Sequence, residues 1–486
     1  MTLLTISIQF VGLVKNIFIA KGFGVSTEVD AYNLANTYTV SITNLAIPAI
    51  TVVLIPFLTR RTNELVIQSA LNTYISTLLL SISLLVLFGS GGTLFLLQSD
   101  VLLSETMQWT LLIIMILSIA QIFRVLTAIL TAFLQVDNDF VTPKVAILCS
   151  TIFSATYVVM ASNPSIIGVS FFLTASFLLE CIFLIIKNKG VSFRFQLQWK
   201  NNAFRKLMRQ TGPVVFNSIV FQISLIFSIT LAGFLGQGYV ATLGYANQIV
   251  SIIQAVIIVN ILTLVYPTMS RAFNKQIKIG KQLFINYVTV ANMLVIPLVV
   301  GMIIVGDLLT ALLFQRGAFT AEDTAQVTFF MTIISIGLPG LVLRDFVYRV
   351  YFCLEDTRTP SRISLVTIGI NIILLLVLTP FFGIYAVILI PSVMNIVSGL
   401  VVYRLLEKRV GKIDPKHTLL KQHIITLVNA VVMGIVLYLL RMQWRMESSA
   451  AFFILVIVGI IVYGLLVCIT QRSILRQLKN KGVSES

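Results

Sequence analysis

Charged residues are scarce in this sequence: they make up 11% of the 486 residues, whereas hydrophobic residues make up 58%. Soluble globular chains carry roughly 25% charged residues, so this composition excludes a soluble domain. Apolar runs of about 20 residues, the length that crosses a hydrocarbon core as a helix, recur from end to end. Because these runs are continuous rather than alternating, a β-barrel is not expected. The sequence therefore predicts an all-α polytopic membrane protein.

Cysteine and histidine are rare as well, with four and two residues. The cysteines lie far apart in or beside apolar runs and lack CxxC spacing, which favours buried packing over a disulfide or a metal site. A GxxxxGK[ST] motif is also missing from the sequence, which argues against ATP hydrolysis by this chain. We therefore predict no enzyme activity, no cofactor and no metal site.

The apolar runs predict fourteen membrane spans. Of the 34 Lys and Arg residues, 26 follow even-numbered spans, four follow odd-numbered spans and four lie inside spans. Positive charge marks the cytoplasmic side, so both termini are predicted to be cytoplasmic. The net charge of +16 then reflects topology, not nucleic-acid binding. The predicted spans are residues 3–20, 31–57, 68–90, 107–134, 145–162, 166–186, 211–235, 240–268, 284–306, 324–352, 362–380, 384–403, 420–440 and 449–470.

An internal repeat organises these spans. Residues 22–60 align on residues 233–271 without a gap, at an offset of 211, and Arg124 matches Arg344 at an offset of 220. Each copy holds six spans, so both copies enter the membrane with the same polarity, as in transporters whose parallel repeats rock about a central site. The predicted domains are an N-lobe (1–190, spans 1–6), a basic cytoplasmic linker (191–210), a C-lobe (211–405, spans 7–12), and spans 13–14 with a basic cytoplasmic tail (406–486).

Ionisable residues near or inside the first two spans are candidates for function. A charge at span depth costs about 2.5–3.5 kcal/mol on insertion scales, so each one requires a reason. Lys15, next to Asn16, could hold an anion in a central cavity, or its long stem could snorkel to the outer interface. Asp30 starts the second span and is either a partner for Lys15 or a helix-start residue.

Arg124 lies deeper, about 16 Å from the cytoplasmic end of the fourth span at helical rise. Gln121, Thr127 and Gln135 follow the same helix face and make a polar stripe, which is expected to line water or another helix rather than lipid. Whether Arg124 binds substrate or ties helices together is left open by the pattern. Glu180 is expected to snorkel and pair near the basic loop at Lys187.

Six charges gather in residues 344–360, at the cytoplasmic exit of the tenth span. They can cap helix ends and pair across lobes, and Asp345 with Arg349 forms an expected i,i+4 pair. Just before them, Pro339 in "GLPG" predicts a kink and a hinge. The cluster predicts a gate rather than a binding pocket. Its members are Arg344, Asp345, Arg349, Glu355, Asp356 and Arg358.

Three stretches carry a resemblance to a known family: "LLFQRGAFTAEDT" (312–324), which contains Arg316 and Gly317, "RVYFCLEDTRTP" (349–360), and "GLVKNIFIAKGFGVSTEVDAY" (12–32). They resemble signature segments of the MurJ-type lipid II flippases, within the multidrug/oligosaccharidyl-lipid/polysaccharide exporter superfamily. The resemblance covers essentially the whole chain. It implies two six-helix lobes around a cationic cavity, with the last two helices forming a groove for a lipid tail.

The function implied by the resemblance is movement of an undecaprenyl-pyrophosphate-linked cell-wall precursor, lipid II, from the inner to the outer leaflet of a bacterial plasma membrane. The family usually carries arginines at the positions of Gln9, Lys15, Thr43 and Gln248, and an acid at Asn16, so this cavity is expected to be less cationic. The residues expected to contact the head group are Lys15, Asn16, Asp30, Arg124 and Gln248.

Three alternatives stay open at this stage. The chain could flip another lipid-linked glycan, such as a capsule or exopolysaccharide repeat unit. It could be a cation-coupled drug antiporter, although its interior is basic where those transporters use acids. It could also be a non-transporting scaffold for glycan-assembly enzymes. The expected partners are a lipid-linked glycan and membrane lipids, with a coupling cation and cell-wall or glycan-assembly enzymes as further candidates, and no nucleic acid.

Overall fold

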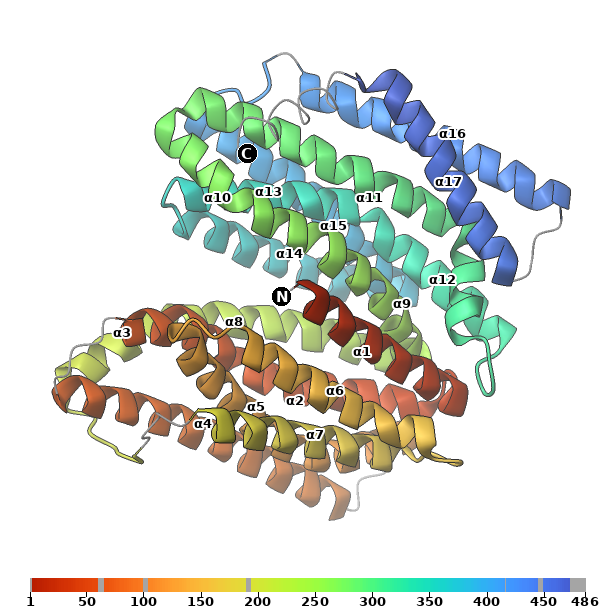
Figure 1. Cartoon of the computed structure of the whole chain (residues 1–486). Helices are drawn as coiled ribbons and strands as arrows, with labels where there is room; N and C mark the ends of the chain where they lie inside the picture. The colour runs from red at the N-terminus through yellow and green to blue at the C-terminus, as the bar shows by residue number, and fades with distance from the viewer. Residues whose placement is uncertain are drawn as a thin grey trace. The chain divides into compact units, whose positions relative to one another are not determined.

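The computed structural model describes residues 2–59, 65–98, 104–188, 194–415, 417–444 and 449–472, and over these residues the chain is helical without a strand (Figure 1). The basic pair Arg60-Arg61 and residues 473–486 of the predicted basic tail lie outside the described residues. By packing, the chain divides into two units. The first comprises Met1–Ala241 with Gly317–Phe319, and the second comprises Thr242–Arg316 with Thr320–Ser486.

In the first unit, α5 packs against α2, α4 and α7, while α1 packs on α6. Its core gathers apolar side chains from several of these helices, among them Ile50, Tyr74 and Val125, which are fully buried. The elements are α1 (Thr2–Phe23), α2 (Thr27–Ala49), a π-helical turn η1 (Ile50–Leu54), α3 (Ile55–Thr59), α4 (Leu65–Gln98), α5 (Glu105–Val136), α6 (Val141–Met160), α7 (Ile166–Lys187) and α8 (Asn202–Leu235).

In the second unit, α11 packs against α10, α12, α13, α16 and α17, and α15 packs against α13 and α14. Figure 1 shows α16 and α17, in blue, beside α11. Helix α9 starts in the first unit and continues into the second. The elements are α9 (Tyr239–Ile253), a π-helical turn η2 (Gln254–Val259), α10 (Asn260–Lys275), α11 (Ile277–Phe314), α12 (Ala321–Ile336), α13 (Leu338–Cys353), α14 (Arg358–Phe382), α15 (Ile384–Val410), α16 (Thr418–Trp444) and α17 (Ser449–Thr470).

Each of the fourteen predicted spans falls on a helical stretch, which confirms an all-α polytopic membrane protein. Among the described residues, thirteen stretches are long and apolar enough to cross a membrane. The predicted span 31–57 is helical but is not one of the thirteen, because α2 carries many polar residues. Two of these bond to α8: Tyr38 shares a 2.7 Å hydrogen bond with Thr230, and Ser41 donates one of 3.0 Å to Gln222.

Helix α8 packs on α2 and α4 and belongs to the first unit, although the predicted C-lobe begins at residue 211. The predicted lobe boundaries follow the sequence repeat, and the packing of the helices does not test whether each repeat moves as one body. The lobe boundaries therefore stay a prediction.

The predicted kink in the tenth span coincides with a break between two helices, and a hinge at this point stays a prediction. Helix α12 ends at Ile336, α13 begins at Leu338, and Pro339 lies in the first turn of α13, where a missing N–H costs nothing. Gly340 then lets α13 approach α15 closely, because a Cβ at this position would come within 2.4 Å of the Cα atom of Ile396.

Two helix corners, between α5 and α6 and between α13 and α14, share one local geometry. Asn138 and Glu355 both have a positive φ, of 62° and 57°. The next residue in each corner, Asp139 or Asp356, accepts hydrogen bonds from the backbone N–H groups two and three positions later. At this corner the offset is therefore 217, whereas the expected offset of 220 would place Glu355 opposite Gln135. The equivalence of Arg124 and Arg344 stays a prediction.

Candidate functional site

Lys15 and Asn16 lie within α1, and both side chains are half-buried. Lys15 is eight residues before the helix end at Phe23, about 12 Å along the axis. Helix α1 packs on α6 in the first unit. Both polar residues therefore lie well inside the first apolar span, and their contact with a head group stays a prediction.

Asp30 is 1% exposed and caps the start of α9. Its Oδ2 atom accepts a hydrogen bond from the N–H of Gly238, and its Oδ1 atom accepts one of 2.6 Å from the N–H of Ala241. The first-turn N–H groups of a helix need such acceptors. Gly238 has a φ of 83°, a backbone conformation that favours glycine. In this conformation its N–H lies next to the Asp30 carboxylate. We interpret Asp30 as a helix cap, since both oxygens are engaged by α9 rather than by Lys15.

Arg124 belongs to a polar cluster inside the first unit. Its guanidinium donates to Gln121 at 3.4 Å and lies over the ring of Phe177, 5.1 Å from the centroid. Gln121 also accepts a 3.1 Å hydrogen bond from the hydroxyl of Thr43 on α2. The cluster thus joins α2, α5 and α7, which favours the alternative in which Arg124 ties helices together.

Glu180 completes this cluster and corrects an expectation. Its side chain is buried, with 7% of the residue exposed, rather than snorkelling toward Lys187. Ser150 of α6 donates to its Oε2 atom at 3.2 Å, and the Arg124 charge attracts the carboxylate. A buried carboxylate is tolerated when a cation and hydroxyl donors surround it. The polar stripe of α5 was expected to line water or another helix, and the sequence did not show that Glu180 of α7 lies against it.

Two of the predicted binding residues, Asp30 and Arg124, belong to different parts of the first unit. Asp30 and Thr43 lie on the same helix, thirteen residues apart, or about 20 Å at helical rise. The cap at Asp30 and the cluster around Arg124 are therefore separate sites within the first unit. Gln248 lies on α9 in the second unit and is half-buried.

The charged cluster of 344–360 is organised within the second unit. Arg344 donates to Asn395 of α15 at 2.9 Å and pairs with Asp345 at 3.2 Å. Asp345 thus makes its direct pair with the adjacent Arg344, and the expected partner Arg349 also attracts its carboxylate. Arg349 instead lies over the ring of Tyr266, 5.3 Å from the centroid.

At the corner itself, Asp356 pairs with Arg409 of α15, whose guanidinium lies 5.9 Å from the ring centroid of Tyr351. Asp356 also accepts from the hydroxyl and the N–H of Thr359 in the first turn of α14, at 2.7 and 2.9 Å. Glu355 and Arg358 are exposed. The corner therefore links α13, α14 and α15, and a role in gating stays a prediction.

The motif residues Arg316 and Gly317 lie in the loop between α11 and α12. Gly317 has a φ of 62°, and a Cβ at this position would come within 2.3 Å of the carbonyl oxygen of Lys21. The N–H of Ala318 donates to that same oxygen at 2.9 Å, and Phe319 is 2% exposed. The loop residues 317–319 thus close over the end of α1, which explains why the motif requires glycine at this position.

Two polar contacts that the sequence reasoning missed attach α16 to α11. Arg441 donates to Asp307 and, at 2.7 Å, to the carbonyl oxygen of Ile304. His423 and Asn292 are 2.7 Å apart through Nε2 and Nδ2. The available signal was Asp307 directly after one predicted span and Arg441 directly after a later one.

Comparison with known proteins agrees with this picture. The family model described as "Lipid II flippase MurJ" matches residues 19–459. A probable lipid II flippase MurJ of Rickettsia prowazekii (strain Madrid E) is 26% identical over 388 residues, covering 76% of this chain and 75% of that protein. A probable lipid II flippase MurJ of Buchnera aphidicola subsp. Baizongia pistaciae (strain Bp) is 25% identical over 405 residues, covering 79% and 76%.

Solved structures show the same fold. A lipid II flippase MurJ in an inward closed conformation superposes with a TM-score of 0.82, at 21% identity, over 98% of this chain and 100% of that one. An inward-facing multidrug resistance MATE family transporter of the MOP superfamily gives a TM-score of 0.66 at 11% identity, over 84% and 96%. With the family model matching nearly the whole length, the chain belongs to the lipid II flippase MurJ family.

Proposed function

We propose that this chain is a flippase that moves lipid II, an undecaprenyl-pyrophosphate-linked cell-wall precursor, from the inner to the outer leaflet by alternating access. The observation that carries the proposal is the family match over residues 19–459, on a chain whose helices form a polytopic membrane fold. The match to the family favours this function over a drug antiporter or a non-transporting scaffold.

The proposed membrane is the bacterial plasma membrane, with both termini in the cytoplasm. The distribution of Lys and Arg after even-numbered spans supports this orientation. An interior-negative potential would then favour outward passage of an anion by about 2.3 kcal/mol per charge per 100 mV. Such a driving force fits a sequence that lacks a nucleotide-binding GxxxxGK[ST] motif.

We assign the head-group contact to Lys15 and Asn16. A pyrophosphate is bound best by fixed cations with additional hydrogen-bond donors, and Lys15 supplies a cation inside the first apolar span. Asp30 and Arg124 support this site from a distance, by capping α9 and by holding the helices of the first unit together. The prenyl tail can remain in lipid while the head group crosses.

One observation favours a second candidate substrate. Thr43 and Gln248 stand in this chain at positions where the resemblance to the family implies arginine. The Thr43 hydroxyl donates its hydrogen bond to Gln121. A less cationic site would suit a different lipid-linked glycan, such as a capsule or exopolysaccharide unit.

Rescue of bacteria depleted of their own lipid II flippase tests the proposal and separates the two substrates. Expression of this chain is expected to restore growth and wall synthesis. A membrane-inserted chain that fails to rescue, yet restores export of another prenyl-linked glycan in a mutant lacking that glycan's flippase, would contradict the lipid II assignment.

A further inference from the structure

An extended segment before α8 lies against α4. The backbone N–H of Gln196 donates to Ser76 Oγ at 3.0 Å, and that of Gln198 donates to Thr73 Oγ1 at 3.2 Å. Ser69 Oγ donates to the side-chain oxygen of Gln198 at 2.5 Å. These bonds hold residues 196–198 along the start of α4's apolar stretch, Gln68–Gln98.

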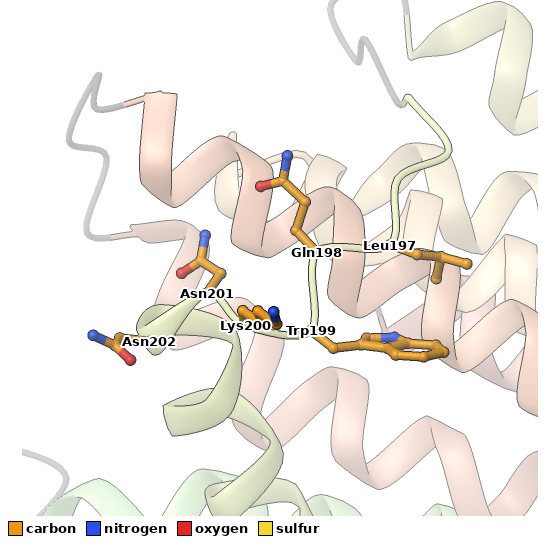
Figure 2. Close-up of a pocket in the computed structure, with 6 residues that line it drawn as sticks. All are labelled: Leu197, Gln198, Trp199, Lys200, Asn201 and Asn202. Carbon is orange, nitrogen blue, oxygen red and sulfur yellow. The ribbon is translucent and has the colours of Figure 1, made fainter.

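The residues that alternate with the two glutamines are large, apolar and exposed. Phe195 is 61% exposed, Leu197 is 41% exposed and Trp199 is 61% exposed. In the extended residues 194–198 successive side chains point to opposite sides, so Phe195 and Leu197 lie opposite the Gln198 side chain, which bonds to Ser69 of α4. Figure 2 shows Trp199 and Gln198 leaving the segment in different directions, beside an open hollow of about 650 Å³ lined by residues 197–202.

Cations flank this apolar stripe and no acid interrupts it. Residues 194–209 contain five Lys or Arg and neither Asp nor Glu. At the start of α8, Phe204 and Leu207 are buried in the core that also contains Tyr74. The three cations of this helix turn, Arg205, Lys206 and Arg209, are exposed. The five are Arg194, Lys200, Arg205, Lys206 and Arg209.

We propose that residues 194–209, here called the 194–209 anchor, bind the anionic phospholipid surface of the leaflet on their side of the membrane. Phe195, Leu197 and Trp199 insert at the boundary between head groups and acyl chains, where aromatic residues are enriched. Arg194 and Lys200 contact the phosphates of anionic head groups, whose negative surface potential attracts polybasic segments. Under the proposed orientation this is the cytoplasmic leaflet.

The position of the anchor favours a lipid surface over a soluble partner. Its bonds reach Ser76, which lies inside the apolar stretch of α4 rather than before it. A segment held beside this part of α4 places the exposed side chains of Phe195 and Trp199 at the membrane boundary. The combination of an apolar stripe and flanking cations is the pattern of interfacial anchors, which gain from buried apolar area and from attraction to anionic lipid together.

Fluorescence quenching in nanodiscs tests the anchor on the full chain. The chain has three tryptophans, so replacing Trp109 and Trp444 with Phe leaves Trp199 as the only emitter. Lipids brominated near the head group are expected to quench Trp199 more strongly than lipids brominated deep in the acyl chain. In mixtures, brominated phosphatidylglycerol is expected to quench more than brominated phosphatidylcholine at the same mole fraction.

Charge variants test the head-group contact. Arg194→Gln and Lys200→Gln are each expected to lower the relative association constant for phosphatidylglycerol by roughly fivefold. The matched control is Lys278→Gln, which removes an exposed cation from the basic stretch between spans 8 and 9, outside the anchor. If the Trp199-only chain does not fold, the parent chain is compared with Trp199→Phe, and the difference in quenching isolates the emission of Trp199.

Emission from Trp199 that is quenched by aqueous acrylamide but not by brominated lipid would overturn the anchor. Equal quenching by the two brominated head groups would overturn the anionic contact. The measurement needs neither substrate nor transport. A failed anchor therefore leaves the flippase proposal standing, and a failed rescue leaves the anchor standing.

Discussion

Asp30 Oδ1 accepts a 2.6 Å hydrogen bond from the backbone N–H of Ala241, the residue at its own position in the second sequence copy, 211 residues later. Asp30 lies in α2, and its carboxylate thus caps α9, the helix that corresponds to α2 in the second copy. The side chain of Ala241 has no hydrogen-bond acceptor, so it cannot cap α2 in return. The contact explains why an acid is needed in one copy and an alanine is sufficient in the other.

Replacing Asp30 is expected to destabilise the first unit. In Asp30→Asn the charge-assisted bonds to Gly238 and Ala241 weaken, and in Asp30→Ala buried donors are left without an acceptor, at a cost of about 1–3 kcal/mol. Thermal unfolding in detergent measures the effect. Glu28→Gln, in the same first turn of α2, is the control and is expected to unfold at the unchanged temperature. Stability unchanged by Asp30→Ala would argue against the cap.

Arg124 and Glu180 are expected to be energetically coupled. Removing one of two buried charges that attract each other leaves the other less compensated, so each single variant should lose stability. Arg124→Gln and Glu180→Gln should each destabilise the protein, and the double variant should lose less than the sum. Unfolding of the four proteins in the cycle gives the coupling energy. Additive losses would show that the two charges act independently.

Gly317→Ala is expected to weaken the closure of the 317–319 loop over α1. The added Cβ would lie 2.3 Å from the Lys21 carbonyl oxygen, and a non-glycine residue at this positive φ costs about 1 kcal/mol before any clash. Limited proteolysis at the exposed Arg316 reports the loss. Gly369→Ala, a helical glycine with no atom within 4 Å of an added Cβ, should leave the digestion pattern unchanged. Equal protection of both variants would contradict the closure.

The two helix corners provide a matched test of gating. Asp139 and Asp356 cap their helices alike, but only Asp356 also pairs with Arg409. If that pair controls movement, Asp356→Asn and Arg409→Gln should change the transport rate to the same extent, whereas Asp139→Asn should not. Asp356→Asn should also cost roughly 1 kcal/mol through the weakened cap. Equal transport effects at both corners would assign them to stability alone.

Acid should affect the first corner in a predictable direction. Hydrogen bonds from Thr142 hold the pKa of Asp139 below its ordinary value of 3.8. A depressed folded-state pKa means that the contribution of Asp139 to stability is complete above about pH 4 and is lost as the pH falls through the lower, folded-state value. The difference in unfolding temperature between the parent and Asp139→Asn should therefore be constant near neutrality and shrink below about pH 4. A difference that grows on acidification would contradict the sign.

The sequence could predict the helices but not their long-range partners. Apolar run lengths located each span, and Pro339 marked the break between α12 and α13, because both signals are local. The roles of Asp30 and Glu180 could not be read in this way. Asp30 depends on N–H groups more than 200 residues away, and Glu180 depends on Arg124 lying on a neighbouring helix. The offset between the two corners could not be read from side-chain identity either, since the backbone turn at Asn138 and Glu355 defines it.

The most direct test of the central claim is the outer-leaflet accessibility of lipid II in cells depleted of their own flippase. Cells expressing this chain should expose lipid II to an extracellular enzyme or antibiotic that recognises it, and Lys15→Arg should retain that exposure while Lys15→Ala, equally abundant in the membrane, should lose most of it. Lipid II that stays inaccessible with the parent chain, or exposure that is unaffected by Lys15→Ala, would contradict the account.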